Sequence, residues 1–130
     1  MLRVTYSVSI PDMDIKGIKS KLSAFAKERD WDQYHSPKNL VMALAGEVGE
    51  LVEHFQWLTE EESRSLAKDR KKLANVSEEV ADLAIYIVRL CDKLGIDLEE
   101  AIEAKIKMNA AKYPVALAKG NATKYTDFKR

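Results

Sequence analysis

The stretch DRKKLANVSEEVADLAIYIVRLCDKLG, residues 69–95, decides the fold. Its apolar residues recur at alternating steps of three and four, which is the pattern of one face of a long α-helix. Gly95 is placed to end this helix. A seam of this length predicts packing against partner helices. The seam residues are Leu73, Val76, Val80, Leu83, Ile87, Leu90 and Leu94.

Helical spacing on both sides of this stretch predicts further helices over residues 14–29, 37–57 and 97–113. No segment has the pattern of a convincing β-strand. The predicted fold class is therefore all-α, a helical bundle of about four main helices that is expected to be oligomeric. The start and stop signals are Asp12 or Asp14, Ser36 with Pro37, the capping box of Thr59 with Glu62, Asp97 and Pro114.

The composition is that of one globular domain spanning residues 1–130, with arms or tails over 1–10 and 115–130. Hydrophobic residues make up 46% and charged residues 32% of the chain, which excludes a disordered protein. Cys91 is the single cysteine, so no internal disulfide is possible and a reducing compartment is favoured. The chain shows neither a signal-peptide pattern nor an apolar run of membrane-spanning length. The expected location is the cytoplasm, without a membrane partner.

Charge is balanced overall but unevenly distributed. The chain has 21 basic and 21 acidic residues, which argues against a nucleic-acid polymer as partner. Six glutamates and no Lys or Arg lie between Asn39 and Ser63, whereas seven basic residues and one acid lie from Lys105 to the end. An acidic centre suits a metal and a basic C-terminal region suits an anion, although charge alone favours solvated faces and a loose tail.

Two acidic pairs, Glu47 with Glu50 and Glu79 with Asp82, carry the metal hypothesis. Each pair has i, i+3 spacing, so both carboxylates lie on one helix face, beside the apolar stripe. Antiparallel packing of the two helices would bring four carboxylates together, and their repulsion calls for a positive charge. Oxygen ligands favour a hard divalent cation such as Mg²⁺, which also takes phosphates as ligands.

A di-iron bundle is the competing metal site. Such sites use Glu-x-x-His motifs on two helices, and this chain has none. Because neither of the two histidines, His35 and His54, belongs to such a motif, the sequence favours an all-oxygen site over an iron site. His54 lies one turn after Glu50 but is left out of the predicted site.

The strings GEVGEL (46–51) and EEVADL (78–83) resemble the E-x-x-E and E-x-x-D signature of the MazG-like all-α nucleoside triphosphate pyrophosphohydrolases. FAKERDWDQYHSPKNL (25–40), HFQW (54–57), KYP (112–114) and KYT (124–126) are similar to the dCTP pyrophosphatase branch of that family. The resemblance covers roughly residues 15–127.

This resemblance implies Mg²⁺-dependent hydrolysis of a nucleoside triphosphate, dCTP or a modified dCTP, to a monophosphate and pyrophosphate. It implies metal binding by the four acids and a homodimer or homotetramer with sites shared between subunits. Glu50 is the chosen general base, because no Lys or Arg lies near it in sequence. The implied substrate-binding residues are Trp31, His35, Trp57, Tyr86, Lys105, Asn109, Lys112 and Tyr113.

Two alternatives stay open at this point. The chain is either this enzyme or a non-enzymatic helical scaffold whose acids are simply exposed. An enzyme of the same class with a different base preference is the second alternative, because aromatic residues stack on any base. Pyrophosphate release that depends on Mg²⁺ would distinguish the enzyme from the non-enzymatic scaffold.

Overall fold

The structure is a computed structural model that describes residues 12–129. These residues form α-helices and short 3₁₀ turns without any β-strand, so the all-α prediction is confirmed. The predicted arm over residues 1–10 lies outside the described residues. The helices are α1 (Ile15–Glu28), α2 (Pro37–Glu53), α3 (Glu60–Ser65), α4 (Arg70–Leu94), α5 (Leu98–Lys112) and α6 (Val115–Ala118). The 3₁₀ turns are η1 (Asp32–Tyr34), η2 (Leu66–Lys68) and η3 (Tyr125–Asp127).

Local capping chemistry sets the helix ends, largely where the sequence predicts them. The Ser36 side chain accepts a hydrogen bond from the backbone N–H of Asn39 at 3.2 Å, with Pro37 in the first turn. The Thr59 and Glu62 side chains each accept from the other's backbone N–H, at 3.1 and 2.8 Å, which completes the predicted capping box. Both predicted N-termini are confirmed.

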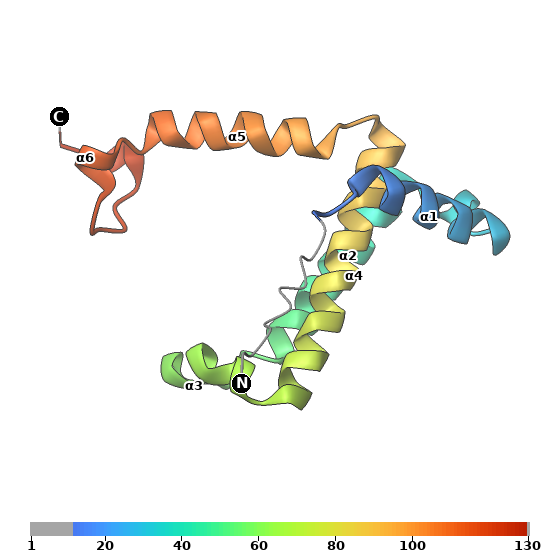
Figure 1. Ribbon diagram of the computed structural model, residues 1–130, viewed down its shortest axis with the longest axis horizontal. Coiled ribbons are helices and arrows are strands. Elements are labelled where there is room, and N and C mark those ends of the chain that lie inside the picture. Colours follow the sequence, from blue (N-terminus) through green and yellow to red (C-terminus); the bar gives the residue numbers. More distant parts are fainter. Residues whose placement is uncertain (1–11, 130) are drawn as a thin grey trace, which may run out of the picture.

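Helices α2 and α4 lie side by side and antiparallel, and α1 crosses the C-terminal half of α4 (Figure 1). The small core forms where α1, α2 and α4 meet. Its apolar members include Ala26, Leu40 and Val88, while Leu66 is buried separately, in η2. No helix among residues 12–129 has the length and hydrophobicity to cross a membrane.

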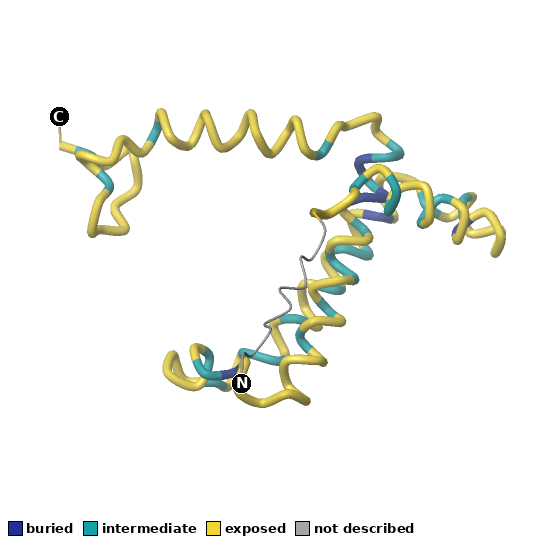
Figure 2. The backbone as a smooth tube through the Cα atoms, viewed as in Figure 1, coloured by how far each residue is buried: buried dark blue, intermediate teal, exposed yellow. Residues whose placement is uncertain are grey.

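Helix α5 extends away from the α2–α4 pair and carries α6 at its far end (Figure 1). Every residue from 99 to 111 is exposed, so the helix appears almost entirely yellow in Figure 2. Its apolar side chains are uncovered, with Ile106 56% exposed. The seam of α4 is also incompletely covered, since Val80 is 51% exposed. The helices of one chain therefore leave much apolar surface unpaired.

Two segments differ from the sequence expectation. Helix α2 ends at Glu53 instead of near Trp57, because residues 54–58 tighten into turns such as the one closed by Leu58 N–H on the Phe55 carbonyl at 2.9 Å. The segment after Pro114, which lacks periodicity, nevertheless contains α6 and η3. It is held by edge-to-face packing of Tyr113 against Tyr125 and Phe128, with ring centroids 5.7 and 5.9 Å apart.

Candidate functional site

Three of the four predicted acids meet where α2 and α4 face each other. The carboxylates of Glu47, Glu50 and Glu79 each offer an oxygen, and these oxygens lie within 4.8 Å of one another. Antiparallel packing produces this arrangement, because the i, i+3 pair on α2 faces α4 at the level of Glu79. Asp82 is not part of that group, but its charge is close enough to affect Glu47.

Lysine and arginine do not compensate the charge of the cluster among residues 12–129. Burial raises the pKa of Glu47, and the charges of Glu50, Asp82 and Glu79 raise it further. Oε2 of Glu47 and Oε2 of Glu79 are buried without a hydrogen-bond partner. Among residues 12–129, no Lys or Arg forms an ion pair with any of the four acids. Buried carboxylate oxygens without partners fit a hard divalent cation, which takes oxygen ligands.

His54, which was left out of the predicted site, is a basic partner of the cluster. Its Nε2 lies 3.5 Å from Oε1 of Glu79, and the Glu79 side chain is only 19% exposed. The available signal was its position one turn after Glu50, since i, i+4 residues share a helix face. His54 therefore borders the acids without contributing to the three-carboxylate group.

A largely apolar cavity of about 280 Å³ lies beside the acids, between α1, the segment after it and α4. This volume is just below the roughly 300–1,000 Å³ typical of small-molecule sites. Asp82 and Tyr86 line the cavity, and Tyr86 has its pKa raised by burial and by the charges of Glu47, Asp82 and Glu50. The remaining lining residues are Leu22, Phe25, Ala26, Trp31, His35, Ile85 and Arg89. The cavity and the acids are thus parts of one site.

The turn after α1 places Trp31 in the cavity wall. Asp30 has φ +57°, a left-handed conformation that Asp tolerates better than most residues. The Trp31 backbone N–H then donates to the Ala26 carbonyl at 2.9 Å. Its ring packs edge-to-face on Phe25, with centroids 5.9 Å apart. The predicted substrate residues Trp31, His35 and Tyr86 therefore share one cavity.

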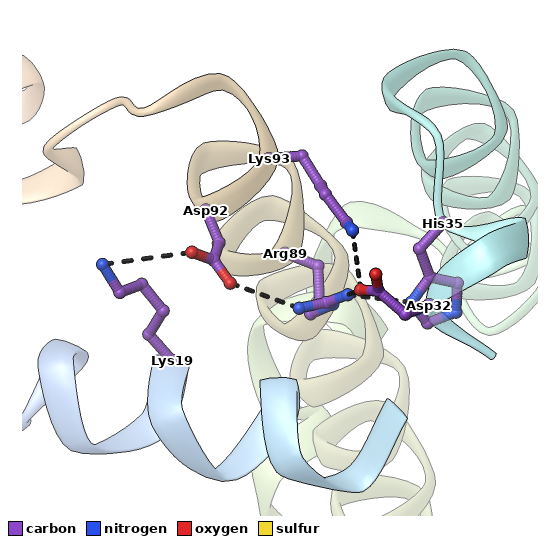
Figure 3. Close-up of polar contacts among 6 residues, drawn as sticks. All are labelled: Lys19, Asp32, His35, Arg89, Asp92 and Lys93. Carbon is purple, nitrogen blue, oxygen red and sulfur yellow. Dashed lines mark hydrogen bonds and ion pairs between the residues drawn. The ribbon is translucent and has the colours of Figure 1, made fainter. Parts of the chain in front are cut away.

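A buried arginine ties this segment to α4, which the sequence analysis did not anticipate (Figure 3). Arg89 donates from Nη2 to Oδ1 of Asp32 at 3.0 Å and from Nη1 to Oδ2 of Asp92 at 3.2 Å. Lys93 donates to the same Asp32 oxygen at 2.6 Å. Hydrogen bonds from Lys93 and Arg89 hold the pKa of Asp32 below its usual range. The only sequence signal was a charged residue inside the apolar run IYIVRLC.

The other predicted substrate residues lie away from the cavity of their own chain. Trp57 follows the C-terminal end of α2, is 87% exposed and does not line the cavity. Lys105, Asn109 and Lys112 lie on the projecting α5, and Tyr113 directly follows it. The Lys112 ammonium lies 5.1 Å from the centre of the Tyr125 ring. One chain therefore brings together only part of the predicted set.

Residues 43–128 match the MazG-like family. This chain belongs to the MazG-like family. The family assignment made from the sequence motifs is thereby confirmed.

The MazG-like chain is similar to curated proteins over most of its length. It is 43% identical over 120 residues to dCTP pyrophosphatase 1 of Mus musculus, covering 92% of this chain and 71% of that protein. It is 40% identical over 117 residues to dCTP pyrophosphatase 1 of Homo sapiens, covering 90% and 69%. A crystal structure of a pyrophosphatase from Archaeoglobus fulgidus superposes with a TM-score of 0.70 at 37% identity, covering 81% of this chain and 98% of that one.

Proposed function

We propose that this MazG-like chain hydrolyses a nucleoside triphosphate, dCTP or a modified dCTP, to the monophosphate and pyrophosphate. The observation that carries the proposal is the junction of a carboxylate cluster with an aromatic cavity, through Asp82 and Tyr86. A triphosphate needs cation-mediated binding and a base needs stacking surfaces. The carboxylate cluster and the aromatic cavity therefore suit the two parts of one nucleotide. Relatives named dCTP pyrophosphatase 1, at 40–44% identity, support the choice of dCTP.

The proposed metal is Mg²⁺, held by Glu47, Glu50, Glu79 and Asp82. The fit rests on the all-carboxylate donor set and on the two buried oxygens without partners. When bound, such an ion would offset the negative charge that develops on the phosphate oxygens. The absence of any Lys or Arg paired with these acids in residues 12–129 leaves their charge available for this role.

The chain's own groups supply the remaining steps. The Trp31 and Tyr86 rings hold the base in the cavity and exclude water from it. A water oxygen attacks a phosphorus of the triphosphate, and the bond from that phosphorus to pyrophosphate breaks. Glu50, which is exposed and therefore reached by water, accepts the proton of that water. Pyrophosphate leaves with the bonding electron pair.

The lysines of α5 are proposed to serve the site of a neighbouring subunit in a homodimer or homotetramer. Helix α5 projects from its own α2–α4 pair (Figure 1), and Ile102, Ile106 and Met108 on it are about half exposed. Apolar side chains exposed in this way gain stability when they cover apolar surface elsewhere. Lys105 and Lys112 would then hold the outgoing phosphates as point charges, with Asn109 and Tyr113 beside them.

A screen of pyrophosphate release over all ribo- and deoxynucleoside triphosphates, with and without Mg²⁺, tests this function. We expect release that requires Mg²⁺ and is fastest with dCTP or a modified dCTP. Glu79→Gln should reduce kcat/KM by about 100-fold or more, since even indirect support of a metal is worth about 10–100-fold. Glu78→Gln is the matched control, because Glu78 is the exposed neighbour outside the cluster. Folded protein that releases no pyrophosphate from any nucleotide would instead favour a non-enzymatic scaffold.

A further inference from the structure

We propose that Arg89 is a positioning residue for base recognition, which fixes the His35 ring so that only a hydrogen-bond donor, its Nε2–H, is left for the base. This inference rests on the proposed function and adds the group that would distinguish cytosine from uracil or thymine. Neither the family signature nor the metal cluster involves Arg89.

Arg89 is held rigidly at the wall of the cavity. Its side chain is 3% exposed, and its two terminal nitrogens bind carboxylates from two different elements, Asp32 in η1 and Asp92 in α4 (Figure 3). Lys93 pairs with Asp32 as well, and Lys19 of α1 lies 4.0 Å from Asp92. The guanidinium is planar and keeps its charge at any physiological pH, so its donor directions are fixed.

The contact between Arg89 and His35 determines which ring nitrogen carries the proton. Nη2 of Arg89 lies 3.3 Å from Nδ1 of His35. A guanidinium has donors and no acceptor, so Nδ1 must act as the acceptor in this hydrogen bond. The neutral ring then carries its hydrogen on Nε2. Among residues 12–129 the Asp32 side chain forms no hydrogen bond with the His35 ring, and its Oδ1 accepts from Arg89 and Lys93.

The electrostatic surroundings keep the ring neutral. Burial lowers the pKa of His35, the Arg89 charge lowers it further, and Lys93 contributes in the same direction. The Asp32 charge opposes them but does not reverse the shift. At neutral pH the ring is therefore uncharged, and Nε2–H is its one donor.

Nε2 is the ring nitrogen that remains available to a ligand. His35 lines the cavity, and within residues 12–129 its Nε2 has no hydrogen-bond partner, nor is it among the polar atoms sealed off from solvent. The rings of Trp31 and Tyr86 line the same cavity. A base stacked between these rings would present its edge to a donor whose orientation Arg89 fixes.

A donor that faces ring nitrogen N3 matches one pyrimidine better than the others. Ring nitrogen N3 of cytosine is an acceptor, whereas N3 of uracil and thymine carries a hydrogen and would face Nε2–H donor to donor. A site built around one hydrogen bond rejects a base that cannot make it, because a buried polar group is left unpaired. A histidine free to change tautomer would accept either base, so the selectivity depends on Arg89.

Nitrogen-15 NMR of the histidine rings tests the tautomer without any turnover. The chain has two histidines, so loss of one set of signals in His35→Gln assigns the other set to His54. We expect Nδ1 of His35 to show the shift of an unprotonated acceptor and Nε2 that of an N–H in the wild-type protein at neutral pH. A proton on Nδ1, or rapid exchange between the two tautomers, would overturn the inference even if the protein hydrolyses dCTP.

Kinetics of Arg89→Met test the consequence for substrate choice. We expect KM for dCTP to rise about tenfold with kcat within about twofold, and the ratio of kcat/KM for dCTP over dTTP and dUTP to fall about tenfold, which corresponds to 1.4 kcal/mol. Lys93→Met is the matched control, because Lys93 also pairs with Asp32 but has no hydrogen bond to the His35 ring and does not line the cavity. It should retain the dCTP preference.

The outcomes separate the two levels of the proposal. Wild-type protein that hydrolyses no nucleotide contradicts the proposed function, while the NMR result still decides the tautomer. Wild-type protein that hydrolyses dCTP, together with an Arg89→Met variant of unchanged preference, contradicts the inference alone. If Arg89→Met does not fold, the wild-type NMR spectrum remains decisive.

Discussion

Glu47 holds its proton more tightly in the folded protein than in the unfolded chain. Burial and three neighbouring acids raise its pKa above the ordinary glutamate value of about 4.3. Between the two pKa values the native state binds more protons than the unfolded state, so the free energy of unfolding falls as pH rises through this range. The loss persists at neutral pH unless a cation compensates for it.

We therefore expect thermal unfolding in EDTA to occur at a lower temperature at pH 8 than just above the ordinary glutamate pKa. Glu47→Gln should raise the pH 8 midpoint by a few degrees, because it removes a charge that the site disfavours. The same variant should lose the stabilisation that Mg²⁺ gives the wild-type protein. Glu53→Gln, an exposed acid on the same helix, should behave like wild type. A Glu47→Gln midpoint below that of wild type at pH 8 in EDTA would contradict this account.

The acids could be predicted from sequence and the arginine could not, for a physical reason. Glu47 and Glu50, like Glu79 and Asp82, show their shared face through local i, i+3 spacing. Arg89 depends on Asp32, which is 57 residues away in the chain. Periodicity describes one helix at a time and is silent about contacts between a turn and a distant helix.

At the scale of the elements, Gly95 ends the longest helix in a conformation that other residues avoid. Its φ is +67°, and its backbone N–H donates to the Cys91 carbonyl as the C-terminal cap of α4. A Cβ added there would meet no atom within 4 Å, so only the backbone conformation opposes a substitution. A substitution at Gly95 therefore measures the cost of the backbone conformation without a change in packing.

Gly95→Ala should accordingly reduce the free energy of unfolding by about 1–2 kcal/mol. Gly95→Asn should cost less, because Asn enters the left-handed region more readily. Urea unfolding followed by circular dichroism measures both. Equal costs for the two variants would show that packing, and not the sign of φ, sets the requirement for glycine.

Capping residues and helix-ending glycine made most helix boundaries predictable from the sequence. The packing between elements was not predictable in this way. Ser36, Thr59 and Gly95 act through hydrogen bonds to their own helix ends, so their signal lies within a few residues. Helix α2 ends at Glu53 because turns follow it over residues 54–58, before α3. The segment after Pro114 is held by aromatic contacts with Tyr113. Neither has a periodic signature.

For the whole molecule, the position of α5 leads to a mixing experiment. Glu79→Gln damages the acid cluster of its own chain, and Lys112→Ala damages the proposed contribution to a neighbour's site. Each variant alone should lose at least about tenfold in activity. Co-expressed and purified together through different tags, they should regain activity, because one site in each pair then receives intact groups from both chains.

A pair with both defects in the same cluster provides the control. Co-assembled Glu47→Gln and Glu79→Gln chains should remain inactive, because every acid cluster carries one of the two changes. Light scattering should show a dimer or tetramer for the wild-type protein. A monomer with full activity, or absence of rescue in a co-purified Glu79→Gln and Lys112→Ala pair, would contradict sharing of the site between subunits.

The overall shape is the level at which sequence was least informative. The α4 seam predicts partner helices but does not say whether they belong to the same chain. In the structure α2 covers one side of α4, while Val80 and Ile106 remain half exposed on separate elements. One chain has more apolar helix surface than its own helices cover. Only the three-dimensional arrangement shows that α5 is almost entirely uncovered and α4 only in part.

The reach of α5 has a consequence for inheritance. Residues 95–97 join it to α4, so in the proposed shared site each copy would contribute its acids to one site and its lysines to another. An organism that carries one normal and one acid-cluster allele would build mixed assemblies, and the defective product would occupy positions beside normal ones. Alleles altered in α5 would complement alleles altered in the acids, whereas two alleles of one kind would not. Genetic complementation groups would therefore map the physical division between the two halves of the site.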